Sequence, residues 1–149
     1  MNAKKMHRNK DGIHIYNEDA YKGIKKACEI ASKTLDMIGN YIEPGVTTEE
    51  LDKTCHDFIL SHNSVPATLG YRGYPKSCCI SLNHVVCHGI PSNKKLKNGD
   101  ILNIDVTCIL DGWFGDTSRM FTVGEIGLKS KRLIEITHDA LLLAIKSVI

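Results

Sequence analysis

The sequence predicts an α+β fold in which helices cover an antiparallel hairpin sheet. Two observations predict it. Apolar residues recur at three- and four-residue steps near both ends of the chain, as in amphipathic helices, whereas residues 101–110 alternate between apolar and polar side chains, as in a strand. The expected order is helix, helix, strands, helix, and helices segregated from a hairpin are typical of an α+β fold and not of a doubly wound sheet.

The first predicted helix follows an apolar row between residues 21 and 38. Its members are Tyr21, Ile24, Cys28, Ala31, Leu35 and Ile38. We expect the side chain of Asn17 to cap the N-terminus of this helix, and Gly39 to end it as the first residue beyond the last turn. A helix of this kind buries its apolar row against the rest of the fold.

A capping signal marks the second helix. Pro44 and Gly45 predict a turn, and Thr47 with Glu50 fits a capping box, in which each side chain binds the free backbone N–H of the other residue. The helix that follows is expected to bury four residues: Leu51, Cys55, Phe58 and Ile59. Glycine, proline, tyrosine and serine then dominate residues 61–76, which predicts a loop.

Strands are expected after that loop. Their predicted ranges are 79–87, 101–110 and 113–123. Asp111-Gly112 is a preferred dipeptide for a two-residue type I′ turn, because both positions need a positive φ. Such a turn joins the last two strands into a hairpin and pairs Leu110 with Trp113.

That register brings two carboxylates onto one face of the hairpin. Because Thr107 then lies opposite Asp116, Asp105 and Asp116 are diagonal neighbours with Cα atoms about 7–8 Å apart. Two ionised carboxylates this close repel each other unless a cation, a basic side chain or a shared proton lies between them. One interpretation is a solvated face neutralised by Arg119 or Lys129, and the other is a site for divalent metals.

The final helix is predicted by a third apolar row, and we expect it to run to the last residue. The row consists of Leu133, Thr137, Leu141, Ala144 and Val148. The longest apolar run, over residues 140–145, is far shorter than the roughly 20 residues that a bilayer requires. A membrane-spanning protein is therefore not expected.

Charge is uneven along the 149 residues. The formal net charge is +2, yet residues 1–10 carry four basic side chains and no acidic one. We expect residues 1–14 to form a basic, flexible tail and residues 15–149 to form the domain. The first ten residues lack the apolar core of a secretory signal, and no basic stripe with interleaved aromatic residues follows, so a cytoplasmic protein that does not bind DNA is expected.

His84 and His88 stand out among seven histidines, because their segment carries a predicted strand into a Gly/Pro-bounded loop. A structural role is the alternative for either histidine taken singly, and His88 lies at the strand end beside a glycine. An imidazole at a strand end can donate to a developing charge or hold a substrate amide. The Gly/Tyr-rich stretch 70–77 is either a tight surface loop or a wall of a small apolar pocket. Nucleophile elbows and phosphate-binding loops are missing from the sequence, so those reaction classes are not expected.

Five motifs in this order and spacing resemble the type I methionine aminopeptidases of the bacterial kind: Gly70-Tyr71-Arg72-Gly73-Tyr74-Pro75-Lys76-Ser77, Cys87-His88-Gly89-Ile90-Pro91, Asn103-Ile104-Asp105-Val106-Thr107, Asp111-Gly112 and Gly115-Asp116-Thr117-Ser118. The resemblance extends from about Ile15 onward. It implies that the chain is the N-terminal half of a pita-bread fold. It also implies removal of the initiator methionine from nascent polypeptides, by hydrolysis with a metal-bridged hydroxide.

Residue by residue, the resemblance implies that Asp105 and Asp116 bridge two divalent metals of the Co, Mn, Fe or Zn class. It implies that His88 contacts the substrate amide and stabilises the charge that develops as the amide bond breaks. The other roles that it implies are walls of the methionine pocket for Tyr71, Tyr74 and Cys79, support beside the metals for Thr107, and a monovalent-cation site for Asn83 and Val85.

Members of that family continue beyond the final helix into a second half, which adds a histidine and two glutamates as metal ligands and a second histidine near the substrate. Two aspartates alone do not hold a dinuclear site. We therefore expect this chain by itself to lack appreciable aminopeptidase activity, and to self-associate where the full-length enzyme is a monomer. The expected substrates are nascent polypeptides with an N-terminal methionine, and ribosome contact is a further expectation.

Two other interpretations stay open. A non-catalytic binding module would dock on a partner or on ribosomal RNA through the basic tail, since half of a pseudo-symmetric domain exposes apolar surface. A peptidase related to prolidase, aminopeptidase P or creatinase would keep the two-aspartate hairpin and act on other peptides. The loop 87–91 and the tyrosine-rich stretch favour the methionine enzyme over this last interpretation.

Overall fold

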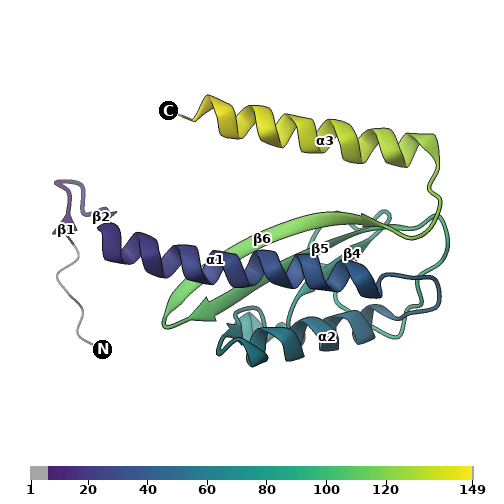
Figure 1. Ribbon diagram of the computed structural model, residues 1–149, viewed down its shortest axis with the longest axis horizontal. Coiled ribbons are helices and arrows are strands. Elements are labelled where there is room, and N and C mark those ends of the chain that lie inside the picture. Colours follow the sequence, from purple (N-terminus) through teal and green to yellow (C-terminus); the bar gives the residue numbers. More distant parts are fainter. Residues whose placement is uncertain (1–6, 149) are drawn as a thin grey trace.

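The computed structural model describes residues 7–148, in which two helices pack on an antiparallel sheet and a third lies apart from them (Figure 1). The helices are α1 (Glu18–Ile38), α2 (Thr48–Ser61) and α3 (Leu128–Ser147), with short 3₁₀ turns η1 (Gly39–Tyr41) and η2 (Tyr71–Gly73). The strands of the sheet are β3 (Val65–Pro66), β4 (Cys79–Leu82), β5 (Ile101–Leu110) and β6 (Trp113–Thr122). The predicted α+β class is confirmed.

The sheet is organised around β5, which pairs with β6 along one side and with β3 and β4 along the other, always antiparallel. Asp111 and Gly112 form the tight turn between β5 and β6, with φ values of 51° and 84°. Leu110 pairs with Trp113, as the type I′ turn predicts. The register of the hairpin is therefore confirmed over its full length.

The core lies between this sheet and the two helices α1 and α2. Alternate residues of β5, namely Leu102, Ile104, Val106 and Cys108, are fully buried on the face toward the helices. They pack with Leu35 and Ile38 of α1 and with Leu51 of α2. Period-two alternation in the strand thus leaves the opposite face of β5 for polar side chains.

Helix α1 begins where the sequence predicts, but its buried row differs. The side chain of Asn17 accepts a hydrogen bond from the backbone N–H of Ala20. Tyr21 and Cys28, both predicted to be buried, are exposed. Ala31, Leu35 and Ile38 of the predicted row are buried as expected, and four further residues are buried with them: Ala20, Ala27, Ile30 and Thr34. The buried face includes Ala27 because Gly115 of the hairpin lies against the backbone of the helix there.

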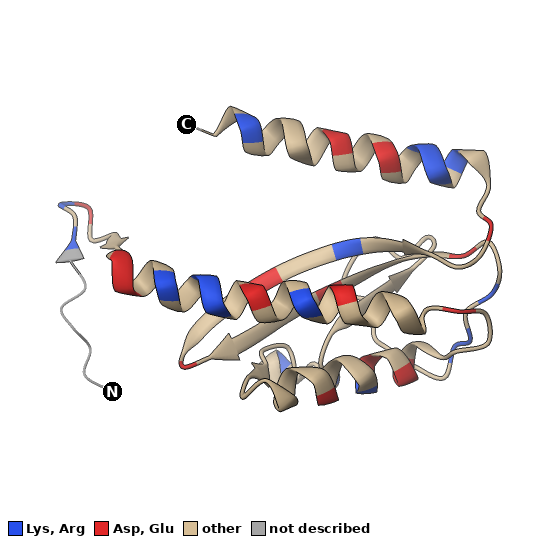
Figure 2. Cartoon of the chain, in the orientation of Figure 1, with Lys and Arg blue, Asp and Glu red and all other residues tan. Residues whose placement is uncertain are grey.

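Helix α1 ends directly before Gly39 as predicted, but Gly39 is its C-cap and not the C′ residue that was expected. Gly39 keeps a right-handed conformation, with φ −53° and ψ −30°, and the chain continues directly into η1. No left-handed glycine is needed here, since the backbone N–H of Gly39 already bonds to the carbonyl of Met37. The lysines and acidic residues of α1 are exposed, and Figure 2 shows how they are distributed along the helix.

Helix α2 begins with the predicted capping box. The backbone N–H of Thr47 donates to Glu50 Oε2 at 2.7 Å, and the backbone N–H of Glu50 donates to Thr47 Oγ1 at 3.1 Å. Leu51, Cys55 and Ile59 are buried as expected. Phe58 is only partly buried, and its ring packs against His62 with centroids 4.2 Å apart.

The capping box predicts an acid-sensitive loss of stability. The backbone N–H of Thr47 lowers the pKa of Glu50 below its ordinary value of 4.5. Because the pKa is lowered in the folded state, the ionised carboxylate stabilises the fold above pH 4.5, and this contribution is lost as the pH falls through the lowered pKa. In urea unfolding, Glu50→Gln is expected to be less stable than the wild type at pH 7, and the difference should vanish below that pKa.

A matched control for this prediction is Glu29→Gln, an exposed substitution on α1. It should leave the free energy of unfolding unchanged at both pH values. A difference between the wild type and Glu50→Gln that stays constant down to pH 3 would contradict a role for the carboxylate charge.

Strand β4 is shorter than predicted, since it ends at Leu82 and not at residue 87. Asn83 turns the chain with a φ of 54°, a left-handed conformation that asparagine tolerates. Its side chain fixes the turn, because Oδ1 accepts from the backbone N–H of Ile101 at 3.1 Å and Nδ2 donates to Asp100 at 2.9 Å. The segment after Asn83 is therefore a loop, not a strand.

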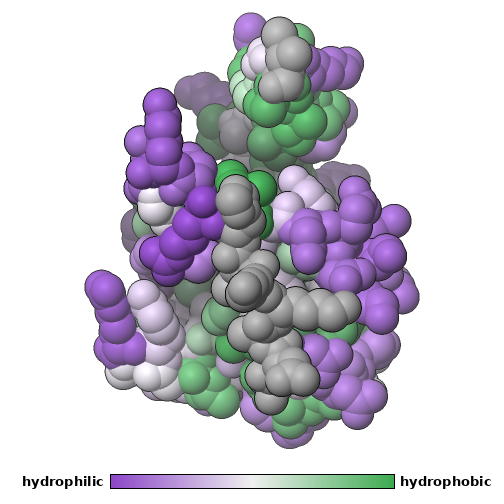
Figure 3. Space-filling view, turned by 90° about the vertical axis from the view of Figure 1, so that its left-hand side faces the viewer, coloured by the Kyte–Doolittle hydropathy of each residue, from purple (hydrophilic) through white to green (hydrophobic). Residues whose placement is uncertain are grey.

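Helix α3 is confirmed as a helix, but it ends at Ser147 and not at the last residue. Ile149 lies outside the described residues. Within the described part, none of the α3 residues is buried, and Leu133, Leu141 and Val148 of the predicted apolar row are 60%, 57% and 80% exposed. Apolar side chains gather on this helix, seen end-on at the top of Figure 3.

The predicted basic tail falls partly outside the structure, because residues 1–6 are not described. From residue 7 the chain forms a short hairpin of β1 (His7–Arg8) and β2 (His14–Ile15), which the sequence did not predict. The side chain of Asn9 holds its turn by accepting from the backbone N–H groups of Asp11 and Ile13. None of the helices in residues 7–148 combines the length and apolar character needed to cross a membrane.

Candidate active site

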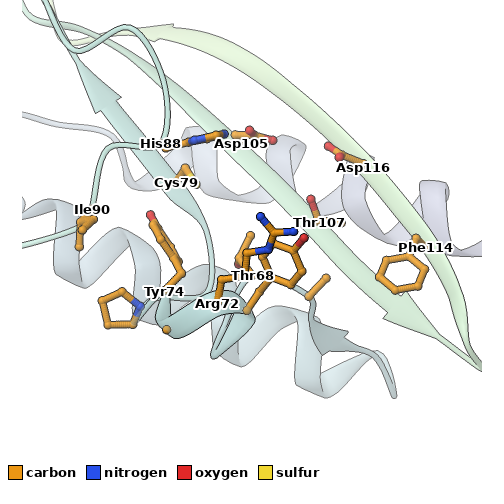
Figure 4. A pocket seen from close by; sticks show the side chains of 14 residues that line it. Thr68, Arg72, Tyr74, Cys79, His88, Ile90, Asp105, Thr107, Phe114 and Asp116 are labelled. Carbon is orange, nitrogen blue, oxygen red and sulfur yellow. The ribbon is translucent and has the colours of Figure 1, made fainter.

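A cavity of about 840 Å³ lies on the polar face of the hairpin, opposite the core (Figure 4). Its size is in the range of ligand sites. Seven of the residues singled out in the sequence line it: Tyr71, Tyr74, Cys79, His88, Asp105, Thr107 and Asp116. Elements far apart in the sequence, namely η2, β4, β5, β6 and the loop after β4, therefore meet at one place.

The two aspartates project from neighbouring strands of the hairpin. Asp105 pairs with Ser118 and Thr107 with Asp116, so both carboxylates lie on the same face. Burial raises the pKa of Asp105, the negative charge of Asp116 raises it further, and His88 acts in the opposite direction. Figure 4 shows the His88 ring beside the carboxylate of Asp105. The site thus concentrates negative charge where solvent is partly excluded.

These carboxylates fit part of a metal site. Carboxylate oxygens are ligands for first-row divalent metals, and a cation between Asp105 and Asp116 would relieve the repulsion that raises the pKa of Asp105. Within the residues that the structure describes, however, no group of three or more His, Cys, Asp or Glu side chains is arranged to hold a metal ion. Further ligands are needed for a complete coordination sphere.

His88 sits in a loop whose backbone is fixed to β4. It adopts a left-handed conformation, with a φ of 54°. The next residue, Gly89, donates its N–H to Ser81 Oγ at 3.1 Å and accepts from the N–H of Ile80 at 2.9 Å. A side chain at Gly89 would collide with the carbonyl of Ile80. Glycine at this position therefore lets the loop approach β4 and sets the position of His88.

Tyr74 and Cys79 form an uncharged part of the cavity wall, and Cys79 of β4 pairs with Asp105 of β5. The Tyr74 hydroxyl lies 3.1 Å from the carbonyl oxygen of Cys78 and 2.9 Å from that of Gly89, and it donates its proton to this pair. Burial raises the pKa of Tyr74 well above its ordinary value, and burial likewise raises the pKa of the Cys79 thiol. Both groups stay neutral, which suits an uncharged side chain of a ligand.

Asp52 of α2 anchors this wall, and the sequence prediction missed it. Its carboxylate is buried and accepts from the backbone N–H groups of Ser77 at 2.9 Å and Cys78 at 3.0 Å. The signal was available, because Asp52 follows the buried Leu51 and precedes the buried Cys55 by three residues. A carboxylate on that face of a helix needs a specific partner.

Other cavity residues were also missed as individual site residues: Ala67, Thr68, Arg72, Gly73, Pro75, Ile90 and Phe114. Arg72 belongs to the Gly/Tyr-rich stretch, where the sequence suggested a pocket wall built from aromatic residues only. The structure adds a guanidinium to that wall. Phe114 follows Trp113 on β6 and is 59% exposed.

Asn83 and Val85, predicted to surround a monovalent cation, lie outside the cavity, in the loop after β4. The side chain of Asn83 is engaged with Asp100 and Ile101, as described above. The backbone N–H of Val85 donates to the carbonyl of Leu82 at 3.1 Å. A role for these two residues in cation binding stays a prediction.

Comparison with known proteins places this geometry in a family. Residues 22–149 match metallopeptidase family M24. Methionine aminopeptidase from Rickettsia prowazekii is 55% identical over 136 residues, which cover 91% of this chain and 52% of that protein.

Solved structures agree with this match. The crystal structure of methionine aminopeptidase from R. prowazekii superposes with a TM-score of 0.85 at 56% identity, covering 86% of this chain and 52% of that one. For the enzyme from Thermotoga maritima the TM-score is 0.88 at 31% identity, with 91% of this chain and 55% of that chain covered. This chain thus has the helices and antiparallel sheet of the pita-bread fold and spans about half the length of these relatives. On the strength of the match to residues 22–149 and of these relatives, the chain belongs to metallopeptidase family M24.

Proposed function

We propose that this chain supplies half of the active site of a metal-dependent methionine aminopeptidase, which removes the N-terminal methionine from nascent polypeptides. One observation carries the proposal: Asp105, Asp116 and His88 line the same cavity as the uncharged groups of Tyr74 and Cys79, and Cys79 is the direct cross-strand neighbour of Asp105. The relatives named methionine aminopeptidase support the substrate.

In this proposal Asp105 and Asp116 hold two divalent metals of the Co, Mn, Fe or Zn class. Bound metals of this kind supply a water molecule of lowered pKa and polarise a carbonyl group. His88 lies beside Asp105, and its imidazole donates to the amide of the substrate. Thr107 lies opposite Asp116 and keeps the surface between the strands polar.

In this proposal the methionine side chain of the substrate packs against the part of the cavity wall formed by Tyr71, Tyr74 and Cys79. The Tyr74 hydroxyl is hydrogen-bonded to two backbone carbonyls, which holds the ring in one orientation. The ring then presents an apolar face to the cavity. Cys79 contributes a buried neutral thiol, which is a soft neighbour for a thioether. A pocket of this type accommodates an unbranched apolar side chain.

The remaining features of the proposal concern the whole protein. We infer that it acts in the cytoplasm, where nascent chains emerge, as a monomer at full length. The basic residues near the N-terminus would contact the ribosome through its phosphates. The isolated chain would self-associate through α3, whose apolar side chains are exposed.

The proposal predicts that turnover depends on the second half of the domain. With added Mn²⁺ or Co²⁺, the 149-residue chain is expected to show no appreciable hydrolysis of Met-Ala-Ser, because its two carboxylates do not complete a metal site. An extended enzyme, in which this chain is continued by the part of the R. prowazekii relative that it does not cover, should hydrolyse this peptide. Release of free methionine measures both activities.

Asp116→Asn in the extended enzyme is the matched test of the site, since the amide keeps the size of the side chain and removes its charge. It should lower kcat/KM by more than about 100-fold, because loss of a group that only supports a metal ligand already costs about 10- to 100-fold. Asp36→Asn on α1, an exposed aspartate that pairs with Arg119, is the control and should retain activity. Robust turnover by the 149-residue chain would contradict the proposal, and an inactive extended enzyme would favour the alternative of a non-catalytic binding module.

A further inference from the structure

Arg72 places a positive charge in a cavity whose other charged walls are acidic. It is the only lysine or arginine among the described residues that line the cavity. Figure 4 shows its side chain pointing from η2 toward the strands, on the side of Thr107. No ion pair joins it to a carboxylate within residues 7–148, and it does not pair with Asp105 or Asp116. The guanidinium is therefore available to a ligand.

The backbone holds Arg72 in a conformation that costs energy. Its φ and ψ of 48° and 32° are left-handed, which only glycine adopts freely. Gly70 and Gly73 on either side take φ values of 82° and 83° without this cost. Hydrogen bonds from Gly70 N–H to Tyr74 O at 2.8 Å and from Tyr74 N–H to Tyr71 O at 2.9 Å hold the turn. The strained backbone conformation is therefore that of Arg72, the residue that places a positive charge in the cavity.

Tyr71 orients the guanidinium. The Arg72 Cζ atom lies 5.4 Å from the centroid of the Tyr71 ring, which is a cation–π contact. A guanidinium that packs its face against a ring leaves its N–H groups at the edge free, in the fork geometry that matches a carboxylate. The expected ligand group is therefore a carboxylate, bound by two parallel hydrogen bonds.

We propose that Arg72 binds a carboxylate that the peptide substrate carries downstream of its N-terminal residue, and so favours peptides with an acidic residue near the cleaved bond. This inference rests on the proposed aminopeptidase function. The N-terminal residue of the peptide is placed at Tyr74, Cys79 and the two aspartates, and a cavity of about 840 Å³ has room for more than one residue. The residues that follow then pass along the wall that carries Arg72.

Three peptides test the proposal on the extended enzyme at low ionic strength: Met-Ala-Glu-NH₂, Met-Ala-Gln-NH₂ and Met-Ala-Gln with a free C-terminus. The glutamate peptide should have a kcat/KM about three- to fivefold higher than its glutamine counterpart, the range of one partly solvated ion pair. The advantage should appear in KM and not in kcat, and it should shrink in 0.5 M salt. The third peptide shows whether a terminal carboxylate is bound equally well.

Arg72→Gln should abolish the preference for the glutamate peptide, so that the ratio of the kcat/KM values of the glutamate and glutamine peptides falls to about one, whatever the absolute rates of the variant. Arg72→Lys should keep part of the preference, since it retains the charge without the fork. Lys94→Gln, which removes one exposed positive charge outside the cavity, is the matched control and should keep all of it. Equal kcat/KM values for the glutamate and glutamine peptides in the wild type would overturn the proposal.

A second measurement separates this inference from the proposed activity. In the 149-residue chain with ¹⁵N-labelled arginine, the Nε resonance of Arg72 should shift more with Met-Ala-Glu-NH₂ than with Met-Ala-Gln-NH₂. If the extended enzyme hydrolyses none of the peptides, the aminopeptidase function fails while this titration still tests Arg72. Equal shifts with the two peptides would overturn the role of Arg72 whatever the activity.

Discussion

Gly115→Ala is expected to lower the free energy of unfolding by about 3 kcal/mol, at the upper end of the usual cost of overpacking. Gly115 lies on β6 directly beneath α1, and a Cβ atom there would collide with the backbone carbonyl of Ala27 and the backbone nitrogen of Cys28. Backbone atoms cannot change rotamer, so the helix and the hairpin must move apart. In a chain of 149 residues this loss lowers Tm by about 10 °C, which differential scanning calorimetry measures.

Gly127→Ala is the matched control for Gly115→Ala. Gly127 precedes α3 with an ordinary φ of −65°, and no atom lies within 4 Å of a Cβ built on it. Its free energy of unfolding should change by no more than about 0.5 kcal/mol. If both variants have the same Tm, the close contact between α1 and β6 does not limit stability. The residue after Gly115 is Asp116, so Gly115→Ala should also displace the carboxylate to which the proposed function assigns a metal.

Asp52→Ala is expected to cost about 3 kcal/mol, because it leaves two buried backbone N–H groups without an acceptor. Each unsatisfied buried group costs about 1–3 kcal/mol. The donors belong to Ser77 and Cys78, directly before Cys79 of the pocket wall. Urea unfolding measures the loss. Faster hydrogen exchange at residues 77–79 should accompany it, since these amides lose their partner.

The control for Asp52→Ala is Asp57→Ala, the same substitution on the same helix. Asp57 is exposed and pairs with Lys53, whose side chain is 74% exposed, so its removal should cost less than about 1 kcal/mol. The loss of unfolding free energy in Asp52→Asn should lie between the losses in these two variants, because an amide oxygen still accepts hydrogen bonds from the backbone but carries no full charge. Equal stability of Asp52→Ala and Asp57→Ala would show that the buried carboxylate does not hold the pocket wall.

Much of the candidate site followed from local rules. The Asp111-Gly112 turn fixes the register of the hairpin, and the register by itself places Asp105 and Asp116 on one face. Asp52 and Arg72 were missed for different reasons. The role of Asp52 depends on backbone groups 25 and 26 residues away, and that of Arg72 on the strands that it faces across the cavity.

The sequence by itself determined the elements that depend on near neighbours, namely the capped start of α1, the capping box of α2 and the hairpin of β5 and β6. Their signals act over two to five residues, within reach of a side chain and its own backbone. Only the tertiary structure decided which residues join Ala31, Leu35 and Ile38 in the buried face of α1, because Gly115 lets the hairpin approach the backbone of the helix at Ala27. It also decided where β4 ends, since Asn83 binds Asp100 and Ile101 across the fold. Contacts between segments far apart in the chain leave no periodic pattern in either segment alone.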